Sequence, residues 1–371
     1  MDEIMQLVRP AITRMTPYSS ARTEGPQIAM RVRLDANESP YPPYPGDARQ
    51  LELNRYPEGQ PEDLLDTFAN FYGVPRDWLL FTRGADEAID LLVRGFCTEG
   101  HDAILHTSPT FAMYLHSAQV QGVDVVDVPL TAHDFQLDVS AVFAAHTANP
   151  HTKILFFCSP NNPTANLLDR DGILRIANAL FGKAIIVVDE LYLDYSGAES
   201  LADAIARQPN IVVLRSMSKE YSLAGERFGI TIAHPCVVSV MGRMLAPYPL
   251  TQTAIRAVTH VMTTEGLIHA KANIAAILEE RSRVAQALSR CRAVAKVFPS
   301  DANFLLVQVD DARALVRTME GRGIKIRDRS ALPGIENSVR ISIGTPEENN
   351  AMLSALEHYT DRTSASFRTG P

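Results

Sequence analysis

The chain has 371 residues, of which 46% are apolar and 21% are charged, a composition that excludes a fibrous or disordered protein. A formal net charge of −8 argues against a nucleic-acid-binding surface, which normally carries a basic excess, and favours small-molecule partners. The four cysteines lie far apart without a CxxC pair, so they indicate neither a zinc site nor a disulfide framework.

The first residues predict an amino-terminal arm, which we place at 1–33. The opening MDEIMQLVRP is acidic at its start and has no apolar stretch, so we expect no signal peptide and a cytoplasmic protein. Uncharged runs such as 228–242 are too short to span a bilayer, so no membrane contact is expected. Prolines and tyrosines concentrate in 34–45, which therefore cannot form a central strand or a helix interior.

Residues 34–247 are predicted to form a large α/β domain. Amphipathic spacing predicts helices at 61–72 and 84–96, the second with acids in its first turn, where the helix dipole favours them. Short apolar runs follow, mostly separated by helix-length segments, at 103–105, 123–128, 154–158, 185–188 and 211–214. Such runs fit strands buried on both faces, and their alternation with helices predicts a mostly parallel central sheet flanked by helices.

Residues 248–371 predict a smaller α/β carboxyl-terminal domain. The expected elements, in order, are helical sequence at 253–290, a strand at 303–309, a helix at 311–321, a strand at 339–343 and a closing helix from 346. The last residues, 361–371, predict a flexible tail.

The stretch SMSKEYSLAGER, residues 216–227, is the first candidate for a functional site. The amine of Lys219 can condense with an aldehyde to a Schiff base, which is useful at neutral pH when the surroundings lower the lysine pKa or the adduct is the resting state. Ser216, Ser218 and Arg227 offer hydroxyl and guanidinium donors suited to a phosphate. Taken alone, a lysine among serines is more often part of a solvated loop, so this interpretation depends on the rest of the chain.

Other polar residues follow predicted strands, and ligands of doubly wound sheets bind at the carboxyl ends of strands. Asp189 ends the run IIVV, where a buried carboxylate could keep a pyridine nitrogen protonated. Tyr192 and Asn162 could bond a ring hydroxyl, and Phe111 could stack on the ring. The loop at 84–86 presents free backbone N–H groups. Each also has an ordinary structural interpretation. Asp189 could be a turn or helix-cap aspartate, Tyr192 and Phe111 could be core aromatics, and Asn162 could form an Asx-turn.

Eight motifs occur in order along the chain: RYPEGQP from Arg55, RGADEAIDLL from Arg83, SPTFAMY from Ser108, CSPNNPT from Cys158, VVDELYLDY from Val187, SMSKEYSLAGERFG from Ser216, APYPL from Ala246 and VRISIGT from Val339. Together they resemble the fold type I pyridoxal-phosphate-dependent aminotransferases of class I/II, and within these the histidinol-phosphate aminotransferases. The likeness runs from Thr16 to the final helix, nearly the whole chain.

The resemblance implies a site for pyridoxal 5'-phosphate with Lys219, Asp189 and Tyr192 as catalytic residues. Lys219 would form the Schiff base, Asp189 would pair with the pyridinium nitrogen, and Tyr192 with Asn162 would bond the ring oxygen. Phe111 would stack on the ring. The cofactor phosphate would lie on a helix N-terminus and be held by Ala85, Asp86, Ser216, Ser218 and Arg227.

The resemblance also implies a homodimer, in which Tyr56 reaches the cofactor phosphate of the other subunit. The substrate's anionic end would be bound by Tyr18, Arg327 and Arg340. The implied reaction belongs to histidine biosynthesis: histidinol phosphate and 2-oxoglutarate give imidazole-acetol phosphate and glutamate in two ping-pong half-reactions. Lys219 would move the proton of the α-carbon.

Alternatives remain at this stage. They are an aminotransferase of aromatic or other amino acids, a phosphothreonine decarboxylase of similar fold, and a cofactor-binding regulatory module without turnover. No metal site is expected, since the sequence lacks an HExxH motif, and it also lacks GxSxG, GxGxxG and Walker motifs.

The sequence departs from the family pattern at several positions. Ala165 stands where the NNPTG motif has glycine, so we expect a positive φ to be less comfortable and the turn to differ. Phe111 stands at a position that is often tyrosine in the family. Glu220 and Glu226 occupy positions expected to be apolar or small, and Glu226 could compete for the charge of Arg227.

Overall fold

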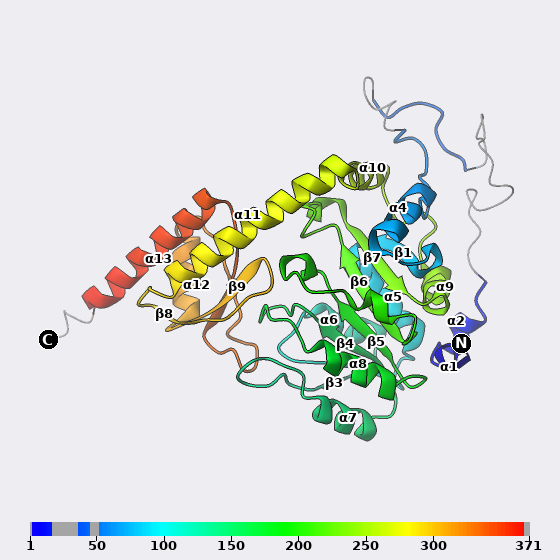
Figure 1. The fold of residues 1–371 in the computed structure, drawn as a ribbon, viewed down its shortest axis with the longest axis horizontal. Coiled ribbons are helices and arrows are strands. Elements are labelled where there is room, and N and C mark those ends of the chain that lie inside the picture. Colours follow the sequence, from blue (N-terminus) through cyan, green and yellow to red (C-terminus); the bar gives the residue numbers. More distant parts are fainter. Residues whose placement is uncertain (1, 17–35, 45–51, 367–371) are drawn as a thin grey trace.

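The computed structural model describes residues 2–16, 36–44 and 52–366, and its described strands form a seven-stranded and a four-stranded sheet (Figure 1). The first sheet has the order β1-β7-β6-β5-β4-β2-β3. Its strands are β1 (Leu79–Arg83), β2 (Ala103–His106), β3 (Asp124–Asp127), β4 (Thr152–Cys158), β5 (Ile185–Asp189), β6 (Ile211–Ser216) and β7 (Phe228–Ala233). Strands β3, β2, β4, β5 and β6 are parallel, and β7 is antiparallel to both β6 and β1. The predicted mostly parallel sheet is confirmed.

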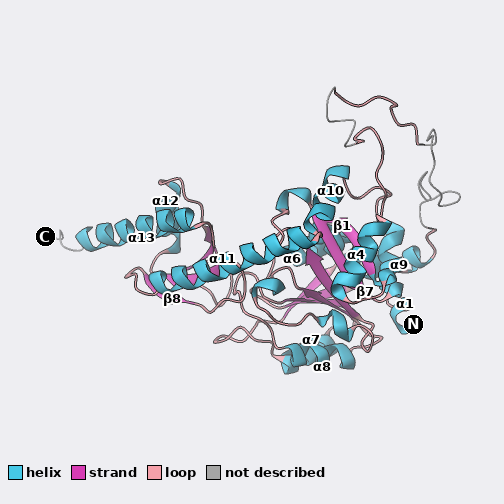
Figure 2. Cartoon of the chain, turned by 45° about the horizontal axis from the view of Figure 1, so that its top comes forward, coloured by secondary structure: helices cyan, strands magenta, loops and turns pink. Residues whose placement is uncertain are grey.

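Helices cover both faces of this sheet (Figure 2). They are α1 (Asp2–Met5), α2 (Pro10–Thr13), α4 (Glu62–Tyr72), α5 (Gly84–Phe96), α6 (Met113–Gln121), α7 (Val139–Ala148), α8 (Arg170–Ala179) and α9 (Pro235–Met244). Successive residues of β4 enter different core clusters: Leu155 and Phe157 pack with α4, α7 and α8, whereas Ile154 and Phe156 pack with α1, α5, α6 and α9. Burial on both faces explains the unbroken apolar runs.

Two strands of this sheet, β1 and β7, were not predicted from the sequence. Both strands are antiparallel to their neighbours. The prediction relied on strands that alternate with helices, a pattern in which β1 and β7 take no part. The run of β7 contains Gly229, which usually weakens a strand. Here a Cβ at Gly229 would lie 2.4 Å from the carbonyl carbon of Gly84, so glycine lets β7 pack against the start of α5.

The second sheet is antiparallel, with the order β10-β11-β9-β8. Its strands are β8 (Val294–Val297), β9 (Phe304–Val309), β10 (Arg327–Asp328) and β11 (Ser338–Ser342), and it packs with α12 (Ala312–Glu320) and α13 (Pro346–Ser366). Strands β9 and β11 match the prediction, whereas the short β8 and β10 were missed. Helix α13 continues to Ser366, although the sequence predicted a tail from 361.

The predicted helical sequence before the second sheet forms two helices, α10 (Gln252–Val261) and α11 (Thr264–Leu288). Thr263 causes the break because its hydroxyl accepts a hydrogen bond from the N–H of Gly266 at 3.1 Å, capping α11. A Cβ at Gly266 would lie 2.5 Å from the Val261 oxygen, so glycine is needed at this corner. Helix α11 then runs from α10 to the second sheet (Figure 1).

The predicted arm contains α1 and α2, and Ile4, Leu7 and Val8 are buried in the core cluster of α5 and α9. Residue 1 and residues 17–33 of the arm, which include Tyr18, lie outside the described residues. Within the described part of the chain, every helix is too short or too polar to cross a membrane. The division into domains at 247/248 stays a prediction.

Candidate active site

The carboxyl ends of three neighbouring strands bring the predicted residues together. Asp189 is the last residue of β5, Ser216 is the last residue of β6, and the loop from Ser159 follows β4. The strand register places Cys158 beside Asp189 and Asp189 beside Leu214, so these ends lie at one edge of the sheet. Parallel pairing therefore produces the cluster that the strand-end argument predicted.

Asp189 is a buried carboxylate held by two donors. The Tyr114 hydroxyl donates to it at 2.7 Å and the Leu191 N–H at 3.2 Å. Burial raises the pKa of Asp189 to about 6, and both hydrogen bonds oppose this rise. A nearby cation would be strongly favoured here, because the carboxylate has lost most of its hydration.

Tyr114 was missed by the sequence analysis. Its ring stacks on Phe156, with centroids 4.6 Å apart, and meets Phe111 edge-on at 5.7 Å. Tyr114 belongs to the first turn of α6, and Phe111 lies three residues earlier, just before this helix begins. The motif SPTFAMY places Tyr114 close to Phe111 in the sequence, but the contact of Tyr114 with Asp189 depends on the tertiary fold.

Lys219 lies in the loop after β6 and is half-buried. Burial lowers the pKa of its amine, and the positive charge of Arg340 lowers it further. The backbone carbonyl of Lys219 accepts a hydrogen bond from the Tyr195 hydroxyl at 3.0 Å, which fixes the loop. A lysine with a lowered pKa is a better nucleophile and base at neutral pH than a solvated one.

The start of α5 and the end of β6 form a group of anion-binding donors. The first turn of α5 has no side-chain cap, so the N–H groups of its first residues, among them Ala85 and Asp86, stay available. Arg227 Nη2 lies 3.1 Å from Asp86 Oδ2, and a Cβ at Gly84 would lie 2.6 Å from the same nitrogen. The Ser216 and Ser218 hydroxyls hydrogen-bond each other at 2.8 Å.

Glu226, which was expected to compete for the charge of Arg227, does not form an ion pair with it. Among the described residues, the ion pair of Arg227 is formed with Asp86 across the sequence, and no ion pair joins Arg227 to Glu226. Arg227 follows the short 3-10 turn Ala224–Glu226 and has a positive φ of 56°.

The second sheet contributes an arginine to the same site. Arg340 of β11 donates from Nη1 to Asn162 Oδ1 at 2.6 Å, and its guanidinium lies over the Phe304 ring at 5.4 Å. Tyr192 meets Phe304 edge-on at 5.2 Å, and burial raises the Tyr192 pKa. Arg327 pairs with Arg340 in the strand register, so both predicted substrate arginines lie side by side.

Ala165 adopts the conformation that glycine favours, with a φ of 67°. Its N–H donates to the Asn161 carbonyl at 2.7 Å, and its carbonyl accepts from the Asp301 N–H at 2.7 Å. The methyl group is fully buried beside Tyr192 and Tyr195. The alanine therefore pays the cost of a positive φ, about 1–2 kcal/mol, rather than avoiding it.

Glu220 is buried in a charged cluster behind the Lys219 loop, with Arg215, Glu190 and Asp194. Burial raises the pKa of Glu220 to about 8, whereas Arg215 lowers it and Asp194 raises it. Its Oε1 is buried without a hydrogen-bond partner. The departure from an apolar residue is thus accommodated by protonation.

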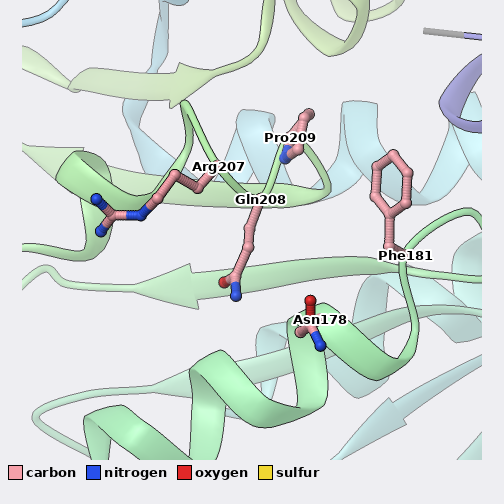
Figure 3. A pocket seen from close by; sticks show the side chains of 5 residues that line it. All are labelled: Asn178, Phe181, Arg207, Gln208 and Pro209. Atoms are coloured by element: carbon pink, nitrogen blue, oxygen red, sulfur yellow. The ribbon is translucent and has the colours of Figure 1, made fainter.

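Tyr56 is about half exposed, and its ring stacks on Tyr248 with centroids 4.3 Å apart. A surface cavity of about 140 Å³ lies elsewhere, at the opposite edge of the sheet, before β5 and β6 (Figure 3). It is lined by Asn178, Phe181, Arg207, Gln208 and Pro209, with the Gln208 amide pointing toward Asn178. It is separate from the Lys219 site.

The fold and site define a class of enzyme: an α/β protein with a half-buried lysine in electrostatic contact with a buried carboxylate at adjacent strand ends. The chain belongs to the aminotransferases of class I and II, since the family model of that description matches residues 31–356. It is 40% identical to the histidinol-phosphate aminotransferase of Aeromonas salmonicida over 353 residues, 95% of this chain and 98% of that protein.

Solved structures give the same fold. The histidinol-phosphate aminotransferase of Sinorhizobium meliloti, in complex with pyridoxal-5'-phosphate, has a TM-score of 0.78 at 23% identity, covering 88% of this chain and 90% of that chain. The L-threonine-O-3-phosphate decarboxylase of Porphyromonas gingivalis has a TM-score of 0.70 at 25% identity, covering 85% and 96%. The predicted fold type I architecture is confirmed.

Proposed function

We propose that this aminotransferase uses pyridoxal 5'-phosphate to transfer the amino group of histidinol phosphate to 2-oxoglutarate. The arrangement of Lys219, Asp189 and Arg227 around the ends of β5 and β6 carries the proposal. Relatives at 40% identity over nearly their whole length bear the name of this activity, which supports the substrate.

The residues present fit the cofactor. Asp189 offers a buried carboxylate to a ring cation, and Lys219 offers an amine of lowered pKa to an aldehyde. The uncapped start of α5, the hydroxyls of Ser216 and Ser218 and the Arg227 guanidinium together suit a phosphate. When bound, pyridoxal phosphate supplies an aldehyde for covalent capture and a protonated ring that withdraws electrons from the substrate's α-carbon.

The protein's own groups then have distinct tasks. The freed Lys219 amine accepts the α-carbon proton of the amino donor, for which its lowered pKa suits it at neutral pH. Asn162 and Tyr192 are the donors placed for the ring oxygen, with Phe111 as a stacking surface. Arg340 and Arg327 bind the anionic end of the substrate, which for histidinol phosphate is the phosphate group.

We also propose that the chain forms homodimers and that 34–247 and 248–371 are its large and small domains, preceded by the arm at 1–33. The exposed ring of Tyr56 suits a contact with the cofactor phosphate of the partner subunit. Hybrid dimers test this sharing. Mixing inactive Lys219→Ala and impaired Tyr56→Ala subunits would restore activity, because one of the two shared sites then has neither change; no restoration would contradict shared sites.

The first test of the proposal is trapping of the lysine. Borohydride reduction of the holoenzyme is expected to fix pyridoxal phosphate on Lys219, as mapped by peptide mass spectrometry. Lys219→Ala would lose both the adduct and turnover, whereas Lys271→Ala, at an exposed position of α11, would keep both. An unchanged adduct in Lys219→Ala would contradict the assignment.

An amino-donor screen then tests the substrate. Histidinol phosphate with 2-oxoglutarate is expected to give the highest kcat/KM. Equal or faster transfer from phenylalanine or tyrosine would favour the aromatic aminotransferase. Release of carbon dioxide from O-phosphothreonine is included because the Porphyromonas gingivalis decarboxylase shares the fold.

A further inference from the structure

Two histidines and an aspartate meet at the amino-terminal edge of the large sheet, away from Lys219. Ligand atoms of His101, Asp102 and His151 all lie within 4.8 Å of one another. His101 and Asp102 directly precede β2, and His151 directly precedes the neighbouring strand β4. The Ala103 N–H donates to the His151 carbonyl at 3.1 Å, so the backbone holds the two turns together.

The carboxylate of this cluster is already oriented. Asp102 is 4% exposed, and its Oδ2 accepts a hydrogen bond from the Thr98 N–H at 2.7 Å. Its Oδ1 lies 3.0 Å from His101 Nδ1. Carboxylates that bind metals in proteins are themselves hydrogen-bonded, as Asp102 is by the Thr98 N–H.

The two imidazoles are accessible to solvent and can complete such a site. Both histidines are exposed, and their rings meet edge-on with centroids 4.6 Å apart. Tetrahedral Zn²⁺ with bonds of about 2.0–2.2 Å requires ligand atoms about 3.4 Å apart, which small side-chain rotations of exposed histidines can reach. Two imidazoles and one carboxylate are ligands for Zn²⁺ and similar borderline cations rather than for Mg²⁺ or Ca²⁺.

We propose that His101, His151 and Asp102 bind one divalent transition-metal cation of the Zn²⁺ type, with water as the remaining ligand. The bound metal links the turns before β2 and β4, so it stabilises the folded protein by mass action. It does not take part in amino transfer, because it lies at the opposite edge of the sheet from Asp189 and Ser216.

Calorimetric titration with Zn²⁺ tests the site. The holoenzyme is used without a purification tag and after desalting, since tags and free cofactor also chelate metals. Wild type is expected to bind one equivalent and to melt at a higher temperature in Zn²⁺. His151→Ala is expected to lose at least about tenfold in affinity and the rise in melting temperature.

Controls separate this site from general surface binding. His116→Ala, an exposed histidine of α6, should bind like wild type, and all variants should melt alike and keep full activity without metal. His101→Ala should reproduce the loss seen with His151→Ala. Absence of binding by wild type, or equal stoichiometry and affinity in the His101→Ala/His151→Ala double variant, would overturn the proposal.

Discussion

Two buried acids interact with the charge of Lys219, and their surroundings differ. Asp189 has donors on both sides, from Tyr114 and Leu191, and a pKa of about 6. Glu220 has an unpartnered oxygen and a pKa of about 8, because burial raises it and Asp194 adds to the rise. At neutral pH, Asp189 is largely ionised and Glu220 is largely protonated.

The difference lies in what each acid faces. Asp189 stands at a strand end that opens toward the candidate site, where a ring cation would offset its burial. Glu220 belongs to a closed cluster in which Arg215 already interacts with Glu190 and Asp194. A further carboxylate there has no cation of its own, so it keeps its proton. Burial alone therefore does not identify a functional acid; the group that it faces does.

The largest expected effect separates the two acids at pH 7. Asp189→Asn keeps the size and removes the negative charge, so kcat/KM should fall roughly 10²–10³-fold, the scale of losing one preorganised electrostatic contact. Glu220→Gln imitates the protonated acid and should retain activity within about twofold. Steady-state kinetics of both variants, loaded with cofactor, check this. Retained activity in Asp189→Asn would remove Asp189 from the catalytic residues.

A smaller effect is expected from the hydroxyl that supports Asp189. Tyr114→Phe removes a hydrogen bond that favours the ionised form of Asp189 by about 1.5–3 kcal/mol. A smaller fraction of Asp189 is then ionised at pH 7, so activity should fall by up to about tenfold. Because this bond lowers the Asp189 pKa, its loss raises that pKa. The acidic limb of the pH–activity profile should therefore move to higher pH. A profile that falls in height without moving would contradict a role through Asp189.

Tyr114 also illustrates which parts of the site the sequence could predict. Asp189 and Ser216 follow from strand ends, because parallel neighbours bring their carboxyl ends to one edge. Tyr114 lies within a helix and reads as a core aromatic, since only the tertiary fold brings it to a carboxylate 75 residues away. The large sheet shows the same division: its parallel strands were predicted, whereas the antiparallel β1 and β7 were missed.

Glu220 marks a second limit of the sequence. Its departure from an apolar residue was visible, but its partners Arg215 and Asp194 come from β6 and the turn after β5, which only folding brings together. The contact of Arg340 with Asn162, 178 residues apart, was likewise beyond local patterns. Position along the chain predicted which residues come together at one edge of the sheet, and not how their charges are balanced.

A stability measurement sharpens the contrast further. The pKa of Glu220 is higher in the folded protein than in the unfolded chain. The protonated side chain therefore contributes fully to folding stability below the unfolded-state pKa, near 4.5, and this contribution is lost as the pH rises through about 8. Relative to Glu220→Gln, wild type should therefore lose unfolding free energy on the order of 1 kcal/mol between pH 7 and pH 9. Urea denaturation of both proteins at the two pH values measures this difference. Parallel pH dependence would show that Glu220 does not titrate in this range.

The smallest effect concerns the other buried departure, Ala165, which carries no charge. Ala165→Gly relieves a positive φ worth about 1–2 kcal/mol. It also removes a buried methyl group, worth about 0.8 kcal/mol, and adds about 0.4–1 kcal/mol of unfolded-chain entropy. The terms nearly cancel, so the unfolding free energy should change by less than about 1 kcal/mol, measured by urea denaturation. Ala165→Val is the comparison variant. A β-branched side chain is unfavourable at a positive φ and would also crowd the packed Tyr192 and Tyr195, so the valine should clearly lower the unfolding free energy. Equal stabilities of the valine and glycine variants would contradict a strained, tightly packed position.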